Sequence, residues 1–524
     1  MPERADTKYW TSLAERDASR SSVEDEFPQP LDPTATSVSR RGFLQAAGFS
    51  AVAATLASCA RAPVEKAIPY LIKPEEVTPG RALWYASTCG GCSAACGVLV
   101  KNRDGRPIKL EGNPDHPLSR GGMCAAGQAS VLGLYDSRRL KQPLLAGTPT
   151  TWADADREVA GRLAAVARDG AVRFLTATLP SPTERSMIGR FLARFPDARH
   201  VVYDAVSSSA ILDAHLRTHG VRVLPRYRVE RAEVIASFDA DFLGTWISPV
   251  EYAAGWRSGR DLESRPPRCS YHAQLESRLS LSGAKADRRV RAAPHEVGPA
   301  LERLTVALAR VAGVAFRSGD GKVGAEVAAI VDDLALRLWQ ARGRSLVVCG
   351  SQDTDVQVLA NLANHLLGSY GATLDIERPS LQRQGSDGDL ATLLTELAAG
   401  RVAALLVAGC NPVFDLPGGA ALAHALGKVP LVVSLAPRLD ETARCAGIVC
   451  PVGHQLEEWG DAEPVAGVFS LRQPAIEPLG DTRPLVESLA LWSGEPRGAL
   501  ELVREHWRSD VFPHQGGERE FEPF

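Results

Sequence analysis

Short, continuously hydrophobic runs alternate with segments of helical periodicity from about residue 150 onward. Uninterrupted apolar runs of this length predict strands that are covered on both faces, and helical segments between them predict parallel connections. The pattern therefore predicts an α/β fold with doubly wound parallel sheets. We expect residues 284–314, which are rich in Arg and Ala, to connect two such sheets. The expected strands are residues 172–176, 200–203, 234–238, 345–349, 403–407 and 430–435, and the expected helices are residues 182–194 and 355–367.

Length and composition are those of a globular protein with several packing units. The chain has 524 residues, of which 45% are hydrophobic and 23% are charged, and both fractions are ordinary for folded domains. Lys and Arg number 59 against 62 for Asp and Glu, a formal net charge of −3. A chain with this charge balance lacks the excess of positive charge that binds nucleic-acid phosphates, so nucleic-acid binding is excluded as a main function.

The first 58 residues have the features of an export signal. Residues 1–36 are polar and rich in proline, and the pair Arg40 and Arg41 precedes an uncharged run over residues 43–57. That run is shorter than the ~20 residues a membrane-spanning helix needs, and with the arginine pair it resembles a twin-arginine export signal. A buried Ala-rich helix after a chance arginine pair is the alternative.

The end of this segment predicts a lipid anchor. The stretch Leu56-Ala57-Ser58-Cys59 resembles a lipobox, in which the cysteine becomes the lipid-bearing N-terminus. We therefore expect a protein exported by the twin-arginine route and lipid-anchored at the periplasmic face of the cytoplasmic membrane. The alternative is that Cys59 is an ordinary small residue beside an ordinary cleavage site.

Four cysteines have the spacing of an iron–sulfur site. Cys89, Cys92 and Cys96 lie within one turn-rich loop, and Cys124 follows after 27 intervening residues. A compact loop can supply three thiolates to a 4Fe–4S cubane while a second segment supplies the fourth. Zinc, which favours two paired knuckles, and a pair of disulfides remain alternatives.

The segment between the third and fourth cysteines predicts a hairpin. Residues 98–100 and 108–110 are apolar and flank a charged turn at residues 102–106. We expect His116, which follows the hairpin, to be a loop residue rather than a ligand, because four thiolates already complete a cubane.

The cysteine segment, with residues 111–117 and 121–127, resembles the cluster-binding segment of the molybdopterin (bis-guanine-dinucleotide) oxidoreductase superfamily. The resemblance implies a β-rich iron–sulfur segment followed by doubly wound α/β domains, and a bis-guanine-dinucleotide molybdenum cofactor (Mo-bisMGD) that is possible here. It also implies that loops at strand ends embrace the cofactor, although these residues could instead end strands and cap helices. The implied cofactor-binding residues are Asn411, Pro412, Glu441, Thr442, Ser207, Ser208 and Ser209.

Three departures from the superfamily pattern lead us to expect no bound molybdenum. Ala126 stands where cofactor-bearing relatives often have Lys or Arg, and the loop that would supply a metal ligand offers only serines, Ser207 to Ser209. The resemblance also ends near Trp492, so we expect the C-terminal β-barrel domain of ~100 or more residues to be lacking.

Further short sequence segments narrow the resemblance to one branch of the superfamily. Residues 9–10, 241–246, 283–287 and 459–464, with the position of Arg40 and Arg41, resemble the molybdopterin-oxidoreductase-like part of the large iron–sulfur subunit of alternative complex III. The partners that this branch implies are a separate ferredoxin-like multi-cluster subunit, cytochrome c subunits, and a quinol-binding subunit of the membrane. The domains expected are a leader with its signal (1–58), a linker (59–80), a 4Fe–4S domain (81–148), α/β domains (149–495) and a C-terminal tail (496–524).

The sequence thus leads to one main functional hypothesis and two alternatives. The main one is an electron-transfer or scaffold subunit of a membrane-associated respiratory quinol oxidoreductase, with one 4Fe–4S cluster. The second is a catalytic molybdopterin-dependent oxidoreductase that binds Mo-bisMGD and one cluster. The third is a purely structural subunit with vestigial cysteines.

Overall fold

The computed structural model describes residues 78, 80–166, 170–317, 319 and 321–522, all of which belong to the compact unit Glu76–Phe524. The predicted export signal with Arg40 and Arg41, the lipid-anchor residue Cys59 and nearly all of the linker lie outside the described residues. Within the described residues, no helix combines the length and the apolar composition needed to cross a membrane.

The predicted hairpin near the cysteines is confirmed, and a third strand completes its sheet. Strands β1 (Leu83–Thr88), β2 (Gly97–Arg103) and β3 (Arg106–Gly112) pair antiparallel in that order. Helix α3 (Ala125–Leu134) is the next element after a loop and packs against β3.

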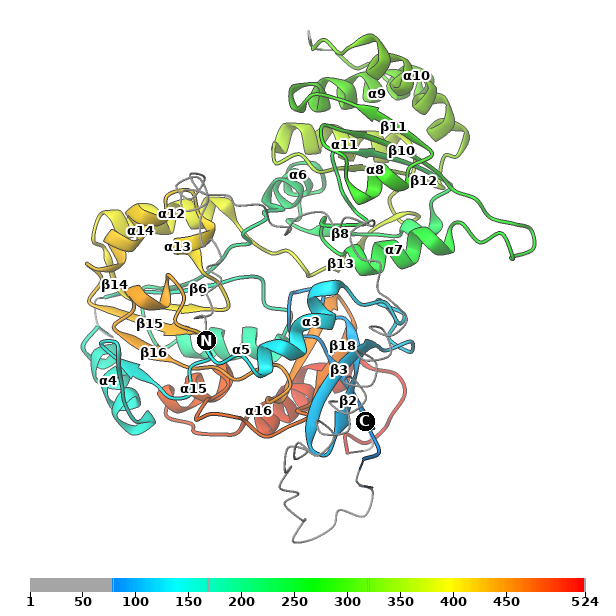
Figure 1. Ribbon diagram of the computed structural model, residues 1–524. Helices are drawn as coiled ribbons and strands as arrows, with labels where there is room; N and C mark the ends of the chain where they lie inside the picture. Colours follow the sequence, from blue (N-terminus) through cyan, green and yellow to red (C-terminus); the bar gives the residue numbers. More distant parts are fainter. Residues whose placement is uncertain (1–77, 79, 167–169, 318, 320, 523–524) are drawn as a thin grey trace, which may run out of the picture. The chain divides into compact units, whose positions relative to one another are not determined.

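A seven-stranded sheet confirms the doubly wound prediction. Its five main strands pair in parallel, and the two-residue strands β4 and β5 extend one edge antiparallel. Alternate residues of each strand face opposite layers: Phe174 packs with α4, α5, α15 and α16, whereas Leu175 packs with α12 and α14. Figure 1 shows these helix layers on the two sides of the sheet. The strands are β5 (Thr148–Pro149), β4 (Leu144–Leu145), β16 (Ile448–Cys450), β15 (Leu431–Leu435), β14 (Val402–Ala408), β6 (Ala171–Thr176) and β7 (Ala198–Val202). The helices are α4 (Trp152–Val166), α5 (Pro182–Leu192), α12 (Asp387–Ala398), α14 (Gly419–Leu426), α15 (Leu485–Trp492) and α16 (Ala499–His506).

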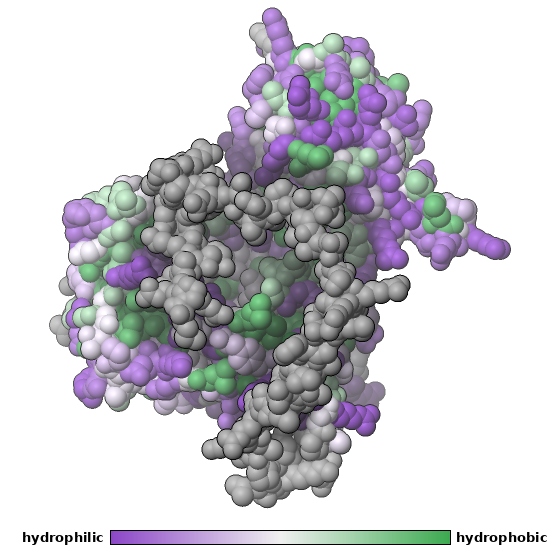
Figure 2. Space-filling view, viewed as in Figure 1, coloured by the Kyte–Doolittle hydropathy of each residue, from purple (hydrophilic) through white to green (hydrophobic). Residues whose placement is uncertain are grey.

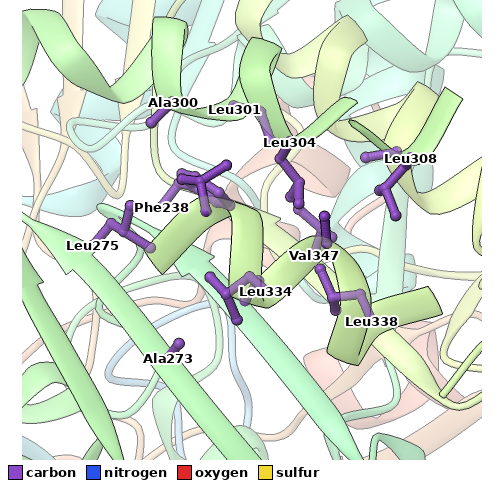
Figure 3. Packing of buried hydrophobic residues seen from close by; sticks show 14 of the residues in the cluster. Phe238, Ala273, Leu275, Ala300, Leu301, Leu304, Leu308, Leu334, Leu338 and Val347 are labelled. Atoms are coloured by element: carbon purple, nitrogen blue, oxygen red, sulfur yellow. The ribbon is translucent and has the colours of Figure 1, made fainter. Parts of the chain in front are cut away.

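A second parallel sheet has the order β11-β10-β9-β12. Leu304 of α9, Leu334 and Leu338 of α10 and Phe238 of β9 belong to one buried hydrophobic core, part of which Figure 3 shows. The surface over α9 and α10 is largely hydrophilic on the face shown in Figure 2, as expected for helices that bury one side only. The strands are β9 (Val234–Phe238), β10 (Tyr271–Glu276), β11 (Arg288–Arg291) and β12 (Ser345–Cys349), and the helices of this part include α6 (Ser209–His219), α7 (Pro249–Ser258), α8 (Leu281–Lys285), α9 (Val297–Ala312), α10 (Ala325–Gln340) and α11 (Thr354–Leu366).

Two expectations are corrected. Residues 284–314 do not connect two sheets, because β11 pairs with β10 and α9 packs on the same sheet. The segment expected to be a C-terminal tail contains α16, whose Ala499 and Leu502 are buried in the core of the seven-stranded sheet.

A four-stranded antiparallel sheet, which the sequence pattern did not predict, has the order β18-β17-β13-β8. The edge strand β18 lies against the cysteine-bearing segment: Thr88 of β1 donates to the backbone oxygen of Leu471 at 2.8 Å, and Ser87 donates to that of Gln473, just after β18, at 3.0 Å. The strands are β8 (Leu224–Tyr227), β13 (Leu374–Ser380), β17 (Gly460–Val465) and β18 (Val468–Arg472).

The core in Figure 3 gives a test of the second sheet. Leu334 of α10 is fully buried, whereas Leu336, two residues along the same helix, is 60% exposed. We expect Leu334→Ala to lower the free energy of unfolding by about 2–5 kcal/mol, because it removes buried methyl groups and leaves a cavity. Leu336→Ala, the matched control, changes it by less than about 0.5 kcal/mol. Urea unfolding of both variants measures the difference, and equal effects would contradict this packing.

Candidate functional site

The first three cysteines lie on a short loop that is closed at both ends. The amide of Cys89 donates to the carbonyl oxygen of Cys96 at 2.8 Å, and the amide of Ala95 donates to that of Cys92 at 3.2 Å. Ala95 has a φ of 45°, a left-handed conformation that turns the chain sharply. The loop therefore carries three thiols over one tight turn.

The fourth cysteine comes from a helix terminus. Cys124 is the N-cap of α3, and its sulfur accepts a hydrogen bond from the Gly127 amide at 3.3 Å. The sulfur of Cys89 likewise accepts one from the Gly91 amide. Both sulfurs therefore have an amide donor, an arrangement suited to metal-binding thiolates.

The four thiols are close enough to perturb one another electrostatically. Burial raises the pKa of Cys96 to about 12, and the neighbouring thiols of Cys92, Cys89 and Cys124 contribute to this rise. Burial also raises the pKa of Cys89, with contributions from Cys92 and Cys124. Four thiolates here would therefore need a cationic core to offset their repulsion. Among the described residues no group of three or more His, Cys, Asp or Glu side chains is arranged to hold a single metal ion.

His116 lies in the loop between β3 and α3, as predicted. Its Nδ1 accepts from the amide of Ser119 at 3.2 Å, and its ring packs so closely on Gly97 that a Cβ there would come within 2.5 Å of it. Burial lowers the pKa of His116. Its side chain thus packs the loop behind the third cysteine.

A cavity of about 530 Å³ opens beside the cysteine loop. One wall is formed by residues 90–93, and others follow the carboxyl ends of β6, β14, β15 and β16. Carboxyl ends of parallel strands are the usual binding edge of open α/β sheets, and the volume is in the range of small-molecule sites.

The cavity wall carries more acidic than basic groups. Its four carboxyl groups are those of Glu184, Asp204, Glu458 and Asp461, and its two guanidinium groups are those of Arg383 and Arg472. Asp461 accepts from the Trp507 indole at 3.0 Å, and Asp204 accepts from the Thr178 hydroxyl at 2.9 Å. Burial raises the pKa of Glu184 and raises that of Glu458 to about 7, while Arg472 opposes both shifts.

The loop that carries Glu458 is attached to the cysteine segment. The Gln455 side-chain oxygen accepts from the Gly90 amide, and its nitrogen donates to Ser130 of α3 at 2.9 Å. Arg139, just after α3, forms a buried ion pair with Glu457. Residues about 320–365 positions apart in sequence thus share one site.

The predicted cofactor-binding residues after β14 and β15 lie together and satisfy one another. Asn411 donates to Glu441 at 2.7 Å and accepts from the Thr442 amide and hydroxyl at 3.1 and 2.7 Å, while Pro412 begins the short helix α13 (Pro412–Asp415). None of the four lines the 530 Å³ cavity.

The predicted serines are also engaged elsewhere. Ser207 donates to Asp387 at 2.8 Å, Ser209 donates to Asp213 at 3.0 Å, and Ser208 is buried at the start of α6. These serines do not line the cavity, so their role as ligands stays a prediction.

Sequence reasoning missed Glu184, Gln455 and Arg472. No local motif marks them, because they come from α5, from the loop before β17 and from the end of β18. Glu458 and Asp461, by contrast, lie beside or within residues 459–464, one of the phrases that carry the resemblance.

Comparisons with known proteins agree with this arrangement. Residues 83–136 match the family model of the molybdopterin oxidoreductase Fe4S4 domain. The chain is 26% identical over 445 residues to the menaquinone reductase, molybdopterin-binding-like subunit, of Nitratidesulfovibrio vulgaris, covering 77% of this chain and 64% of that protein. One sulfite dehydrogenase subunit of Allochromatium vinosum is 42% identical over 65 residues, which are 12% of this chain and 7% of that protein.

Among solved structures, acetylene hydratase from Pelobacter acetylenicus shares the fold, with a TM-score of 0.64 and 13% identity, covering 80% of this chain and 71% of that one. The chain spans less than two thirds of the length of either curated relative. The predicted resemblance to the molybdopterin oxidoreductase superfamily is confirmed, and the Fe4S4 domain supports a 4Fe–4S cluster.

The raised pKa of Glu458 predicts a pH effect on stability. Its pKa rises from 4.5 to about 7 in the folded protein, so the folded form keeps a proton that the unfolded chain releases, and this contribution to stability is lost as pH rises through that window. We expect Glu458→Gln, which cannot ionise, to gain stability relative to the unsubstituted protein between pH 4.5 and about 7. Thermal unfolding across this range measures the difference, and a constant offset would contradict the shift.

Proposed function

We propose, from the premise that residues 83–136 form the Fe4S4 domain of a molybdopterin-type oxidoreductase, that the protein is an electron-transfer or scaffold subunit of a membrane-associated respiratory quinol oxidoreductase. In this proposal Cys89, Cys92, Cys96 and Cys124 bind one 4Fe–4S cluster. The observation that carries it is the closed three-cysteine loop beside the N-cap cysteine of α3. The similarity to a menaquinone reductase subunit supports the respiratory role.

The residues present fit a cluster. When bound, a 4Fe–4S cluster supplies one-electron transfer. The cysteine thiols would hold it, and the amides of Gly91 and Gly127 donate to two of the sulfurs. A small apolar core that includes Val98, Leu110 and Leu456 packs against Cys89 and limits the access of water from that side.

The same cavity does not suit a pterin dinucleotide. The phosphates of such a cofactor are anionic, and the wall carries four carboxyl groups against two guanidinium groups. Burial raises the pKa of Glu184 and Glu458, so these two carry a full negative charge only at a higher pH than usual. Bringing like charges together in a partly buried site is costly. This supports our inference that the molybdopterin fold of this protein carries no molybdenum.

A catalytic molybdopterin-dependent oxidoreductase is the second candidate. One observation favours it: a cavity at the carboxyl ends of the main parallel strands opens directly beside the cysteine loop. In that case the loops of Asn411, Glu441 and Thr442 would have to contact the cofactor outside this cavity.

The expected partners and location belong to the proposal. We infer a complex of the alternative complex III type, with a separate ferredoxin-like multi-cluster subunit, cytochrome c subunits, and a quinol-binding subunit of the membrane. The protein would leave the cytoplasm through the twin-arginine signal at Arg40 and Arg41 and stay at the periplasmic membrane surface through Cys59. Residues 59–80 would then act as a linker to the 4Fe–4S domain at 81–148, which precedes the α/β domains at 149–495.

Metal analysis of anaerobically purified protein tests the function. We expect iron and sulfide without molybdenum or pterin, and an EPR signal on reduction. Cys92→Ala removes that signal because a cubane loses one of its four ligands. Cys269→Ala is the matched control, since Cys269 is also exposed but lies between α7 and β10. Iron together with molybdenum would support the second candidate, and absence of iron would leave only a structural subunit.

Membrane attachment tests the proposed lipid. We expect Cys59→Ala to release the protein from membranes stripped of partner subunits, because the acyl chains supply about 0.8 kcal/mol of attachment per buried methylene. Fractionation followed by immunoblotting measures the bound share, with Cys269→Ala as control. Continued attachment of Cys59→Ala would refute lipidation at this residue.

A further inference from the structure

Arg472, at the end of β18, lies against the backbone between two of the proposed cluster ligands. A Cβ at Gly90 would stand 3.0 Å from Nη1 of Arg472, and a Cβ at Gly460 would stand 2.6 Å from Nη2. A side chain at Gly460 would force the guanidinium to move, and one at Gly90 would crowd it. Gln455 contacts Gly90 as well, so the cysteine loop rests on both side chains.

The guanidinium is not engaged in a tight ion pair. Its closest carboxylate is that of Glu184, with Nη2 3.8 Å from Oε1, whereas Arg483 binds Asp156 with two hydrogen bonds of 2.6 and 2.9 Å. The Nε of Arg472 is buried and has no hydrogen-bond partner among the described residues. Arg472 and Glu184 are only 17% and 19% exposed, so water screens their charges weakly.

The charge of Arg472 acts on the cysteine site. Its guanidinium lies against Gly90, the residue that follows Cys89, with Nη1 3.0 Å from the place a Cβ would take there. Reduction adds an electron to the cluster, so a nearby cation stabilises the reduced state and a nearby carboxylate destabilises it. Arg472 and Glu184 therefore oppose each other at this site.

We propose that Arg472 is a positioning residue that raises the reduction potential of the 4Fe–4S cluster, and that Glu184 lowers it. This inference rests on the proposed cluster. In the test below dithionite is the reductant: it is oxidised to sulfite and would reduce the bound cluster by one electron, and no covalent bond of the protein forms or breaks.

The reduction potential of the full-length, cluster-loaded protein tests this. In an EPR-monitored redox titration with dithionite in alkaline buffer, we expect Arg472→Gln to shift the midpoint to more negative values. Arg472→Lys keeps the charge and stays closer to the unsubstituted protein, and Glu184→Gln shifts the midpoint to more positive values. A purely structural ion pair would not give shifts of opposite sign.

Arg228 and Asp375 provide a matched control pair, because they are 18% and 20% exposed and lie 3.0 Å apart without lining the cavity. Arg228→Gln and Asp375→Asn leave the midpoint unchanged.

Unchanged midpoints in Arg472→Gln and Glu184→Gln, or shifts of the same sign, would overturn the inference while the proposed cluster stands. If Arg472→Gln loses its cluster, the midpoints of Arg472→Lys and Glu184→Gln test the inference: the first should stay close to that of the unsubstituted protein and the second should be more positive. Unsubstituted protein without iron would instead overturn the proposed function itself.

Discussion

The structure around the cysteines depends on one electrostatic constraint. Four thiolates must lie close together and partly buried, so their negative charges need positive groups or hydrogen-bond donors nearby. Two of them, Cys89 and Cys96, are sheltered from water, and burial together with the neighbouring thiols raises the pKa of each. Backbone amides of Gly91 and of Gly127, in the first turn of α3, donate hydrogen bonds to two of the sulfurs. These donors lower the cost of thiolates only in part, so the arrangement is suited to a cationic core that the thiols enclose.

That arrangement is built from distant parts of the chain. The cysteine loop belongs to a small antiparallel sheet near residue 90, but the side chains beneath it come from residues 455–472. Hydrogen bonds from Thr88 to Leu471 and from Asn102 to the carbonyl of Ala475 fasten the two segments together. The cluster segment and the end of the α/β part therefore form one unit of structure, and Arg472, nearly 400 positions away in sequence, lies beside the cysteine loop.

Local patterns predicted what local physics determines. Buried strands such as β9 and β12, with every residue inaccessible, show as continuous apolar runs, and the cysteine spacing marks its own loop. The antiparallel sheet was missed because β13 carries Asp375, Glu377 and Arg378 and pairs irregularly, so neither alternation nor an apolar run marks it. Arg472 and Glu184 have ordinary sequence surroundings. Their role follows only from long-range contacts, which composition and spacing do not encode.

The predicted cofactor-binding residues and the residues that line the cavity differ for a physical reason. Asn411, Glu441 and Thr442 lie at strand ends, where superfamily loops meet a cofactor, yet their polar groups already bond one another. A ligand there would have to replace bonds that exist, which yields little net free energy. The cavity beside the cysteines instead presents carboxyl groups in excess. In the proposed function these carboxyl groups, when ionised, disfavour an anionic dinucleotide, and by the same Coulomb interaction they disfavour the addition of an electron to a nearby cluster. Because a single arrangement of charges acts on both, the acidic cavity and the weakly paired Arg472 are best understood together, as opposing influences on the charge that the cysteine site can accept.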